Sequence, residues 1–545
     1  MAHFVCPIPS VPGAGEAPSI PDINFAPGDT RPTANDERKV PKSILIIGSG
    51  VFGLSTALAL THRPEIPPDT PITVLDRSPE PGVFPARDAS SIDSSRIIRA
   101  DYADPAYAAL AAEAHVHWRR NHLDDPTSLG GDGRYNESGL LLAAENGPDG
   151  ATVRPDGHPT GLGYTRRSWV NAMALAHKEG RSLQSVRLLP SAFALGKVMQ
   201  NDAHWADWGY VNTAAGWADA ERSMKWLYDK VVETGRVTFV NGTVEALGTQ
   251  AAEKEQQQQQ RVTGARLSDG RKFSADLVIV AAGAWTPTLV DLAGSAVATG
   301  QCIGYLRLTD EEQAKLAKMP VCLNLTDGCF VIPPRNNVLK IARHSYGYLN
   351  PQPISHEPLK SSRASETSKP AAARTISQPR THLTDPSLEI PAEGASDLRR
   401  ALGRMIPWLS DRPFFQTRLC WYTDTPTGDW IIDYHPVYKN LFVATGGSGH
   451  GFKFLPILGD KVVDCLLGRC PEVFREKWKW KGGVGINGGN GTGYDDDASG
   501  TTMGQSGNRG AADMAVELNV ATEDGSRGGK PGLILSDEMA KSAGS

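Results

Sequence analysis

Residues 43–63 read SILIIGSGVFGLSTALALTHR, an apolar run whose character changes at its glycines. Branched apolar residues before the glycines are typical of a buried strand, and the small apolar residues after them are typical of a helix. A proline-rich loop follows, and then a second apolar run, ITVLD, ends at Asp76. The order of strand, glycine turn, helix and strand predicts a βαβ unit.

The glycine turn of this unit has the spacing GxGxxG. In a dinucleotide-binding loop the first glycine makes a tight turn, the second lets the backbone approach a pyrophosphate, and the third packs the helix against the strand. The phosphate charge then lies at the positive N-terminus of the helix. Ligand contacts are therefore expected from Gly48, Ser49, Gly50, Val51, Phe52 and Gly53.

The end of the second strand carries an acid followed by a base. Asp76 stands where an acidic residue accepts hydrogen bonds from the adenosine ribose hydroxyls. Arg77 would approach a 2′-phosphate if the ligand were NADP. The loop and these two residues predict a dinucleotide, and they leave both a nicotinamide and a flavin cofactor open.

The composition narrows the class of protein. The 545 residues are 40% hydrophobic, which is enough for a large core in two or three domains. The net charge of -5 is spread along the chain without a dense Lys/Arg stripe, so nucleic acid is not an expected partner. The seven cysteines are scattered and form no CxxC pair, so no disulfide scaffold, zinc site or other metal is assigned.

The sequence also gives expectations about the setting. No basic start followed by an apolar core marks a secretory signal, and the longest apolar run, 44–60, contains three glycines that make it a poor membrane span. We expect an intracellular, cytoplasmic monomer. The peroxisome stays open as an alternative, although the terminal sequence KSAGS is not a peroxisomal tripeptide.

Four further blocks accompany the opening stretch in order. They are ASSIDSSRIIRADYADPAY at 89–107, GWADAERSM at 216–224, DLVIVAAGAWT at 276–286 and VLKIARHSYGYLN at 338–350. Together the blocks resemble the flavin-dependent amine oxidases that include monomeric sarcosine oxidase, fungal saccharopine oxidases and fructosyl amino acid oxidases (amadoriases). The resemblance spans nearly all of residues 43–481 and favours FAD over a nicotinamide cofactor.

A late stretch, CWYTDTP, carries the cysteine to which that family attaches FAD, and its cysteine is Cys420. The resemblance therefore implies a thioether between Cys420 and the 8-methyl group of the flavin. A thiolate is a strong nucleophile, and a cationic neighbour such as Arg418 would favour it. Without the motif, Cys420 would be read as an inert buried residue.

The resemblance also assigns catalytic residues. Lys340 matches the lysine that activates oxygen, where a fixed cation stabilises the charge that oxygen acquires. Arg99 matches the arginine that grips the substrate carboxylate, and Lys453 matches a second cation at the same group. His344 and Tyr422 are expected to line the site.

Flavin contacts are expected around the ring as well. The turn GGSGHG, residues 446–451, leaves a predicted strand and enters a helix near Phe452, so its backbone N–H groups would face the pyrimidine edge of the flavin. The predicted contacts outside the first loop are Ser95, Arg96, Val244, Cys420, Gly447, Gly449, His450, Gly451, Phe452 and Lys453.

One position departs from the amadoriases, which tend to have Asn-Lys where this chain has Ser95-Arg96. The SRIIR form is closer to sarcosine and saccharopine oxidases. We therefore expect oxidation of a secondary amine of an N-substituted amino acid (saccharopine-, pipecolate- or sarcosine-like), with oxygen as acceptor and hydrogen peroxide as product. A fructosyl amino acid oxidase, a specialised-metabolism FAD oxidoreductase, an NAD(P)-dependent dehydrogenase and a non-catalytic nucleotide-binding protein stay open as alternatives.

The expected fold is α/β, with a Rossmann-type FAD-binding domain and a substrate domain on a mixed or antiparallel sheet. The FAD domain is expected at 43–106, 212–300 and 437–480, and the substrate domain at 107–211 and 301–436. Helices are expected at 105–121 and within 216–235, and three extended pieces between 237 and 283 should form a meander. Disorder or flexibility is expected at 1–42, the glutamine run 256–260, 351–385 and 482–545.

Overall fold

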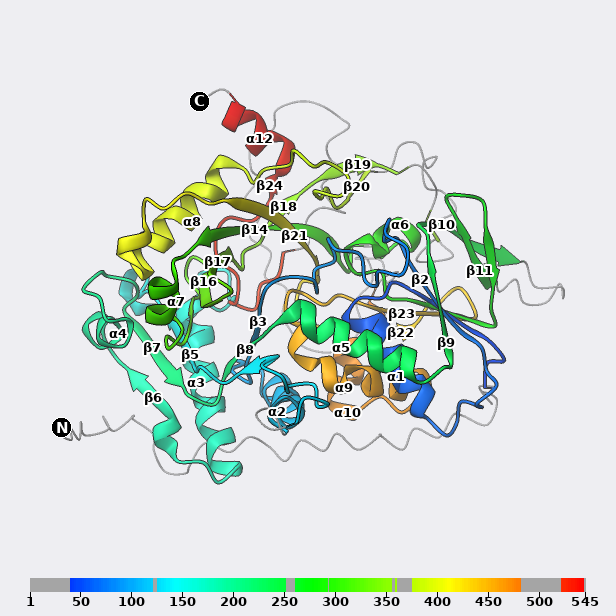
Figure 1. The fold of residues 1–545 in the computed structure, drawn as a ribbon, viewed down its shortest axis with the longest axis horizontal. Coiled ribbons are helices and arrows are strands. Elements are labelled where there is room, and N and C mark those ends of the chain that lie inside the picture. Colours follow the sequence, from blue (N-terminus) through cyan, green and yellow to red (C-terminus); the bar gives the residue numbers. More distant parts are fainter. Residues whose placement is uncertain are drawn as a thin grey trace.

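The computed structural model describes residues 40–120, 125–250, 260–292, 294–354, 358–359, 375–481 and 521–543. Two large sheets organise these residues, with helices packed against each (Figure 1). No helix in the described ranges has the length and apolar character needed to cross a bilayer.

The first sheet is mainly parallel and has the strand order β22-β23-β13-β1-β2-β9. All neighbours run parallel except β22, which lies antiparallel at one edge. The bounds are β1 Ile44–Ile47, β2 Ile72–Asp76, β9 Val237–Asn241, β13 Leu277–Val280, β22 Ile431–Tyr434 and β23 Leu441–Thr445. The central strands ILII and LVIV are buried throughout, as a parallel sheet covered on both faces requires.

The two faces of this sheet are covered by different structures. Ile44 and Ile46 pack against helices, whereas Leu45 and Ile47 pack against the meander on the other side. The helices are α1 Val51–His62, α2 Pro105–Arg119, α5 Ala220–Glu233, α9 Leu455–Leu466 and α10 Glu472–Trp478. The meander consists of β10 Val244–Gln250, β11 Arg261–Leu267 and β12 Lys272–Ser274. The predicted βαβ unit and Rossmann-type domain are confirmed.

The second sheet is mixed and has the order β24-β18-β14-β17-β16-β15-β5-β7-β6, with β21 also paired to β14. Most neighbours are antiparallel, and the pairs β15–β5 and β18–β24 are parallel. The bounds are β5 Leu140–Ala144, β6 Val186–Leu189, β7 Trp208–Asn212, β14 Val297–Arg307, β15 Val321–Asn324, β16 Cys329–Arg335, β17 Val338–Arg343, β18 Tyr348–Leu349, β21 Gln416–Asp424 and β24 Leu533–Ile534. The predicted mixed sheet of the second domain is confirmed.

Shorter elements complete the fold. Helices α3 Gly161–Lys178, α4 Ala192–Met199, α7 Asp310–Leu316, α8 Ala392–Met405 and α12 Leu535–Ala543 belong to the second part, and α6 Thr286–Leu289 follows β13. Small sheets join β3 Arg96–Ile98, β8 Gly216–Ala218 and β4 Tyr135–Asn136, and β19 Pro351–Pro353 with β20 Thr375–Ser377. Single 3₁₀ turns lie at η1 Pro148–Gly150, η2 Leu183–Ser185, η3 Gly283–Trp285, η6 Pro407–Leu409 and η7 Gly451–Phe454.

The C-terminal prediction is wrong for residues 521–543. This segment returns to the second sheet, where β24 pairs with β18 and α12 packs against α8. Leu535 is fully buried, and Arg527 is 6% exposed. The glycine-rich composition concealed this because the segment owes its order to contacts made far away in sequence, not to its own propensity.

Two domain boundaries also shift by a few residues. β22, predicted to lie in the substrate domain, is an edge strand of the first sheet, and β14 of the second sheet begins before the predicted boundary at 300. The two strands on either side of the glutamine run in sequence, β10 and β11, pair antiparallel, as the predicted hairpin requires. Of the residues where flexibility was predicted, 1–39, 256–259, 355–357, 360–374 and 482–520 lie outside the described residues. The predicted flexible insertion 351–385 begins instead with an ordered strand, β19, which pairs with β20.

Candidate active site

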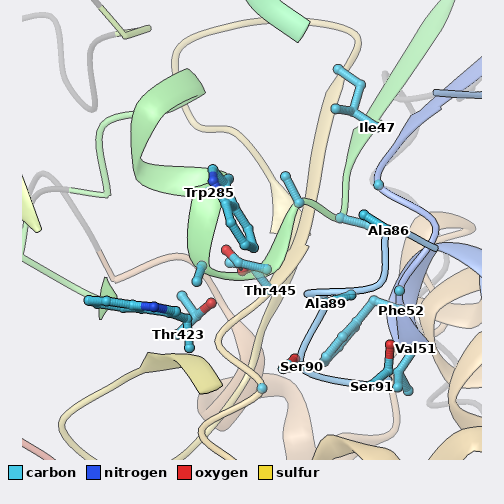
Figure 2. Close-up of a pocket in the computed structure, with 18 of the residues that line it drawn as sticks. Ile47, Val51, Phe52, Ala86, Ala89, Ser90, Ser91, Trp285, Thr423 and Thr445 are labelled. Atoms are coloured by element: carbon cyan, nitrogen blue, oxygen red, sulfur yellow. Dashed lines mark hydrogen bonds between the residues drawn. The ribbon is translucent and has the colours of Figure 1, made fainter. Parts of the chain in front are cut away.

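A long cleft opens at the carboxyl ends of the parallel strands of the first sheet, where α/β sheets bind their ligands. Figure 2 shows Trp285, Thr423 and Thr445 on one side of it, with Phe52 and Ala86 opposite. Predicted contacts that line the long cleft are Gly48, Gly50, Val51, Phe52, Asp76, Arg77, Arg96, Val244, Tyr422, Gly447, Gly449, Gly451 and Phe452.

The first glycine loop fits a pyrophosphate. Gly48 has a φ of +100°, and a Cβ there would lie 2.5 Å from the carbonyl oxygen of Ala281. A Cβ on Gly53 would lie 1.8 Å from the carbonyl oxygen of Gly48. By contrast, a Cβ on Gly50 would meet no protein atom within 4 Å. The first turn of α1 has no side-chain cap, so its N–H groups stay free for an anion.

Asp76 lies at the edge of the long cleft but is bound by the protein itself. One carboxylate oxygen accepts hydrogen bonds from the backbone N–H and hydroxyl of Ser49, at 2.9 and 2.7 Å. The other accepts from the N–H groups of Ser78 and Ala86, at 3.0 and 3.1 Å. Asp76 therefore organises the loop in this structure, and a ribose hydroxyl would have to replace one of these donors. The ribose contact stays a prediction.

Arg77 has partners other than a phosphate. Its guanidinium lies 3.6 Å above the ring of Trp285 and forms an ion pair with Asp88. The stacked Arg77 and Trp285 make a flat wall at the end of the cleft beside Asp76. A flat face of guanidinium and indole suits an adenine ring, and the ion pair with Asp88 already neutralises the charge that a 2′-phosphate would need.

An inner chamber adjoins the long cleft and shares Arg96, Tyr422, Gly449 and Phe452 with it. Its walls bring together the predicted catalytic residues Lys340, His344, Arg99, Lys453 and Tyr422 with Cys420 and His450. Ser49, Gly53 and Ser95 do not line either space: Ser49 and Gly53 support the loop from beneath, and the carbonyl of Ser95 accepts a hydrogen bond from Lys340.

Cys420 is buried in β21, and its register opposite Gln301 of β14 fixes where its sulfur lies. The Nη2 of Arg96 is 3.7 Å from Sγ. Arg418, which was expected to be the cationic neighbour, instead donates to the carbonyl oxygens of Ile92 and Ala89 at 2.6 and 2.9 Å. The expectation for Arg418 is therefore wrong, and Arg96 takes that place.

Lys340 belongs to a buried charge cluster. Its Nζ is 2.7 Å from Asp93, which also pairs with Arg96 and accepts a hydrogen bond from the Tyr305 hydroxyl at 2.8 Å. The pKa of Lys340 is lowered to about 8. Burial is the main cause, Asp93 opposes the lowering in part, and the charge of Arg96 adds to the lowering. Burial raises the pKa of Asp93, but the three cations around it outweigh burial and hold that pKa below its usual range.

Arg99 and Lys453 both line the inner chamber. Arg99 follows β3, is 6% exposed, and has no acceptor for its Nη1 among the described residues. Lys453 donates to the hydroxyl of Tyr102 and to the carbonyl of His450, both at 2.9 Å. Burial, followed by the charge of Arg99, lowers the pKa of Lys453 well below its ordinary value. Asp101 offsets part of the cost of burying both side chains, and the Nη1 of Arg99 is left for an anion.

An ordered chain of hydrogen bonds continues from Lys453. The Tyr102 hydroxyl lies 3.0 Å from Nδ1 of His450, and Nε2 of His450 lies 2.7 Å from the carbonyl oxygen of Gly428. Because a carbonyl only accepts, Nε2 carries the proton and Nδ1 accepts from the tyrosine. His450 is thus held as a neutral ring by this chain.

An outer chamber continues from the inner one and shares Arg99, His344 and His450 with it. Its remaining walls come mainly from α2, α3, the loop after β21 and the C-terminal segment. Three residues of the site are not among those predicted from the sequence: Asp93, Tyr102 and Arg527. The first two stand in the quoted block 89–107, whereas nothing in the local sequence marked Arg527.

The two sheets, the long cleft and the chambers define a two-domain oxidoreductase that binds a dinucleotide. A family model described as FAD dependent oxidoreductase matches residues 43–465, and the chain belongs to this family. The resemblance stated from the sequence is confirmed, and FAD replaces the nicotinamide alternative.

Individual relatives extend over most of the chain. The amino acid oxidase imqH of Aspergillus flavus is 32% identical over 486 residues, or 81% of this chain and 98% of that protein. The L-saccharopine oxidase of Schizosaccharomyces pombe is 28% identical, covering 81% of this chain and 93% of its own length. A modified fructosyl peptide oxidase from Aspergillus nidulans has a similar structure, with a TM-score of 0.66, 27% identity, and coverage of 81% of this chain and 94% of that one.

Proposed function

We propose that this protein oxidises a secondary amine of an N-substituted amino acid, with oxygen as acceptor and hydrogen peroxide as product. The observation that carries the proposal is the inner chamber, which joins the end of the FAD-fitting cleft to the unpaired Nη1 of Arg99. FAD held in the long cleft would supply the two-electron acceptor for the amine.

The two cations would fix the substrate by its carboxylate. A planar guanidinium with a free Nη1 suits a carboxylate oxygen, and Lys453 adds a second charge from η7. An anion at this place would offset the repulsion that Arg99 imposes on Lys453. The carboxylate is thus held at one end of the chamber, and the amine carbon is left to face the long cleft.

The lining of the inner chamber has a consequence for the amine proton. The described residues of its wall include no Asp or Glu, and burial lowers the pKa of Lys453 and of His344. A cationic amine would meet a wall rich in basic side chains, namely Arg96, Arg99, Lys340, Arg343 and Lys453. The chamber therefore favours an amine that enters in its neutral form, and no dedicated general base is required.

The substrate class also rests on the Ser95-Arg96 pair and on the names of the relatives, which include an L-saccharopine oxidase. A fructosyl amino acid is the second candidate, because the similar solved structures include fructosyl peptide oxidases. Both candidates share a carboxylate and a secondary amine, so both suit Arg99 and Lys453.

A peroxide assay tests the proposal. The yellow holoenzyme is offered saccharopine, pipecolate, sarcosine and a fructosyl amino acid, and a catalase-sensitive signal is expected with at least one of the first three. A signal with the fructosyl compound alone would select the second candidate. Silence on all four by a flavin-loaded protein would refute the proposed substrate class.

Lys340 should set the reaction with oxygen. We expect Lys340→Met to slow the return of yellow colour on mixing substrate-bleached enzyme with oxygen by roughly 100-fold, since a fixed buried cation is lost. Anaerobic bleaching by substrate should change little. Because the pKa of Lys340 is lowered to about 8, the wild-type lysine is charged below about pH 8, and its oxygen rate should fall as the pH rises above that value.

Lys340→Arg provides the matched control. Arginine stays protonated throughout this range, so the oxygen rate of this variant should not fall above pH 8. Stopped-flow absorbance of the flavin measures both steps separately. If Lys340→Met slowed flavin reduction by substrate as much as flavin reoxidation by oxygen, a role limited to the oxygen reaction would be contradicted.

A further inference from the structure

The C-terminal segment forms one wall of the outer chamber. Thr522, Asp524, Ser526 and Arg527 line this space opposite Tyr164 of α3, beside Arg99 and His344. The outer chamber shares Arg99 and His344 with the inner chamber. The C-terminal segment therefore lies beside the proposed carboxylate site, although it is distant from the rest of that site in sequence.

Backbone pairing anchors this wall to the strand that carries His344. Gly528 forms a bridge with Ser345: its N–H donates to the carbonyl of His344, and its own carbonyl accepts from Tyr346, both at 3.2 Å. A Cβ on Gly528 would lie 2.1 Å from the carbonyl carbon of Asp327, so only glycine permits this approach. The position of Arg527 follows from this pairing.

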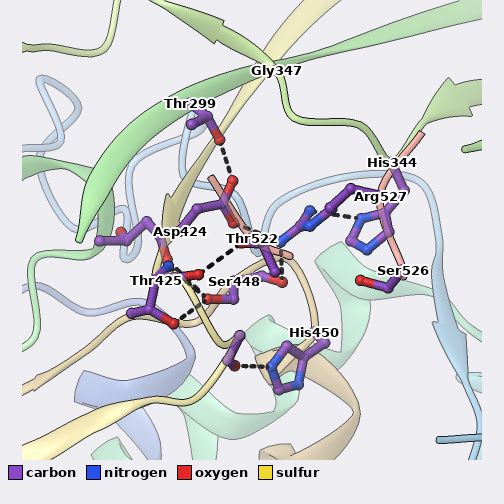
Figure 3. Close-up of polar contacts among 12 residues, drawn as sticks. Thr299, His344, Gly347, Asp424, Thr425, Ser448, His450, Thr522, Ser526 and Arg527 are labelled. Carbon is purple, nitrogen blue, oxygen red and sulfur yellow. Dashed lines mark hydrogen bonds and ion pairs between the residues drawn. The ribbon is translucent and has the colours of Figure 1, made fainter. Parts of the chain in front are cut away.

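Arg527 links three parts of the site, as Figure 3 shows. Its Nη1 lies 3.1 Å from Nδ1 of His344, and its Nη2 donates to Asp424 at 2.6 Å and to the carbonyl of Ser448 at 2.9 Å. Asp424 in turn accepts from the hydroxyl of Thr299 at 2.6 Å. The guanidinium is thus fixed between β21, the GGSGHG turn and His344.

These contacts determine the state of the His344 ring. A guanidinium can only donate, so Nδ1 of His344 must be the acceptor, and the proton of the neutral ring lies on Nε2. Burial, followed by the charges of Arg527, Arg99 and Lys453, lowers the pKa of His344 well below its ordinary value. The groups that face the ring are Arg527, Arg99, His450, Lys453, Tyr422 and, through Arg527, Asp424.

We propose that the C-terminal segment is part of the substrate site, and that Arg527 is a positioning residue that holds His344 as a neutral donor, through Nε2–H, to an oxygen of the bound amino acid. His344 lines both chambers, which places it where a substrate passes or rests. The inference rests on the proposed function and deepens it: His344 binds substrate and does not act as a base.

The test uses the full-length holoenzyme with Arg527→Gln, Arg527→Lys and Glu523→Gln. Glu523 is the matched control, because it lies in the same segment and its partners are Arg154 and the Tyr346 hydroxyl, not the His344 ring. Binding of benzoate, followed by the flavin absorbance, and KM for the preferred amino acid are both measured from pH 5.5 to 8. Flavin content and melting temperature are recorded for each variant.

In Arg527→Gln we expect KM and the benzoate Kd to rise roughly 10- to 100-fold, the range for a lost charge-assisted hydrogen bond. Removing the cation beside the ring also removes the second-largest cause of the lowered pKa of His344, so that pKa should move upwards and a change of binding with pH should appear at the acid end of the range, where wild type is flat. Arg527→Lys should recover part of the affinity, and Glu523→Gln should stay within about twofold of wild type.

Three outcomes would overturn the inference. Arg527→Gln could bind and turn over like wild type, which would leave His344 independent of it. Arg527→Gln and Glu523→Gln could lose affinity equally without a new pH dependence. The segment would then have only a structural role, and Arg527 would not position His344. A flavin-loaded wild type that neither binds benzoate nor oxidises any of the four amino acids would remove the proposed function itself, a result distinct from the first two.

Discussion

Denatured wild-type protein is expected to keep its yellow absorbance on the polypeptide during gel filtration, whereas Cys420→Ala should release all of it. Cys420 lines the inner chamber where that chamber meets the FAD-fitting cleft, and Arg96 stands 3.7 Å from its sulfur. A thioether to the flavin needs a cysteine sulfur beside the ring, and sulfur is a strong side-chain nucleophile. The measurement is the flavin absorbance of the protein fraction.

The other cysteines make the expectation selective. Burial raises the pKa of Cys322, and of Cys302 and Cys329, above the usual thiol range, which leaves these thiols inert. Cys322→Ala is therefore the matched control: it removes a fully buried thiol from β15 and should leave the flavin attached. Yellow colour that leaves wild type on denaturation, or stays with Cys420→Ala, would show that Cys420 does not hold the cofactor.

The glycine loop and its sheet could be predicted because the signal is local. Gly48 needs a positive φ and Gly53 needs close packing, and both demands are met within a few residues of β1 and α1. Lys340 and Cys420 were assigned from motifs, and the structure brings them to the walls of one chamber. Motifs of this kind mark residues that act on a ligand.

The partners of those residues could not be predicted, because they depend on which segments meet. Asp93 reaches Lys340 only because the loop before β3 packs over β17. Carbonyl oxygens of the same loop accept the hydrogen bonds of Arg418, the residue that sequence proximity suggested as the cationic neighbour of Cys420. Arg527 is the extreme case. It lies after a glycine-rich stretch that reads as unstructured, and its order comes from Asp424 and His344, which are more distant than any local pattern reaches.

Arg99→Gln should abolish selection for the substrate carboxylate. Removing one partner of a buried ion pair costs about 2–5 kcal/mol, which corresponds to a fall in kcat/KM of about 30-fold to several thousand-fold. The amide keeps hydrogen-bonding capacity but loses the charge and the fork that match a carboxylate. Arg99→Lys should lie between wild type and Arg99→Gln, because it keeps the charge alone.

The melting temperature of Arg99→Gln should not fall with its activity, and this result distinguishes a substrate-binding role of Arg99 from a structural role. In the free enzyme Arg99 is a buried cation whose Nη1 lacks an acceptor among the described residues, and it repels Lys453; Asp101 offsets only part of this cost. Its replacement by a neutral side chain removes that penalty, so the melting temperature of Arg99→Gln should be equal to or above that of wild type. A structural arginine would give the opposite result.

The decisive measurement pairs the variant with a substrate that lacks the same group. Wild type should prefer pipecolate or sarcosine over piperidine or dimethylamine by a large factor, because only the acids meet Arg99 and Lys453. If Arg99 acts through the carboxylate, the variant should lose rate on the acid and change little on the bare amine, so that the preference collapses. Equal losses on the acid and on the amine would place Arg99 elsewhere in the reaction, and Lys453 would then be the remaining carboxylate ligand.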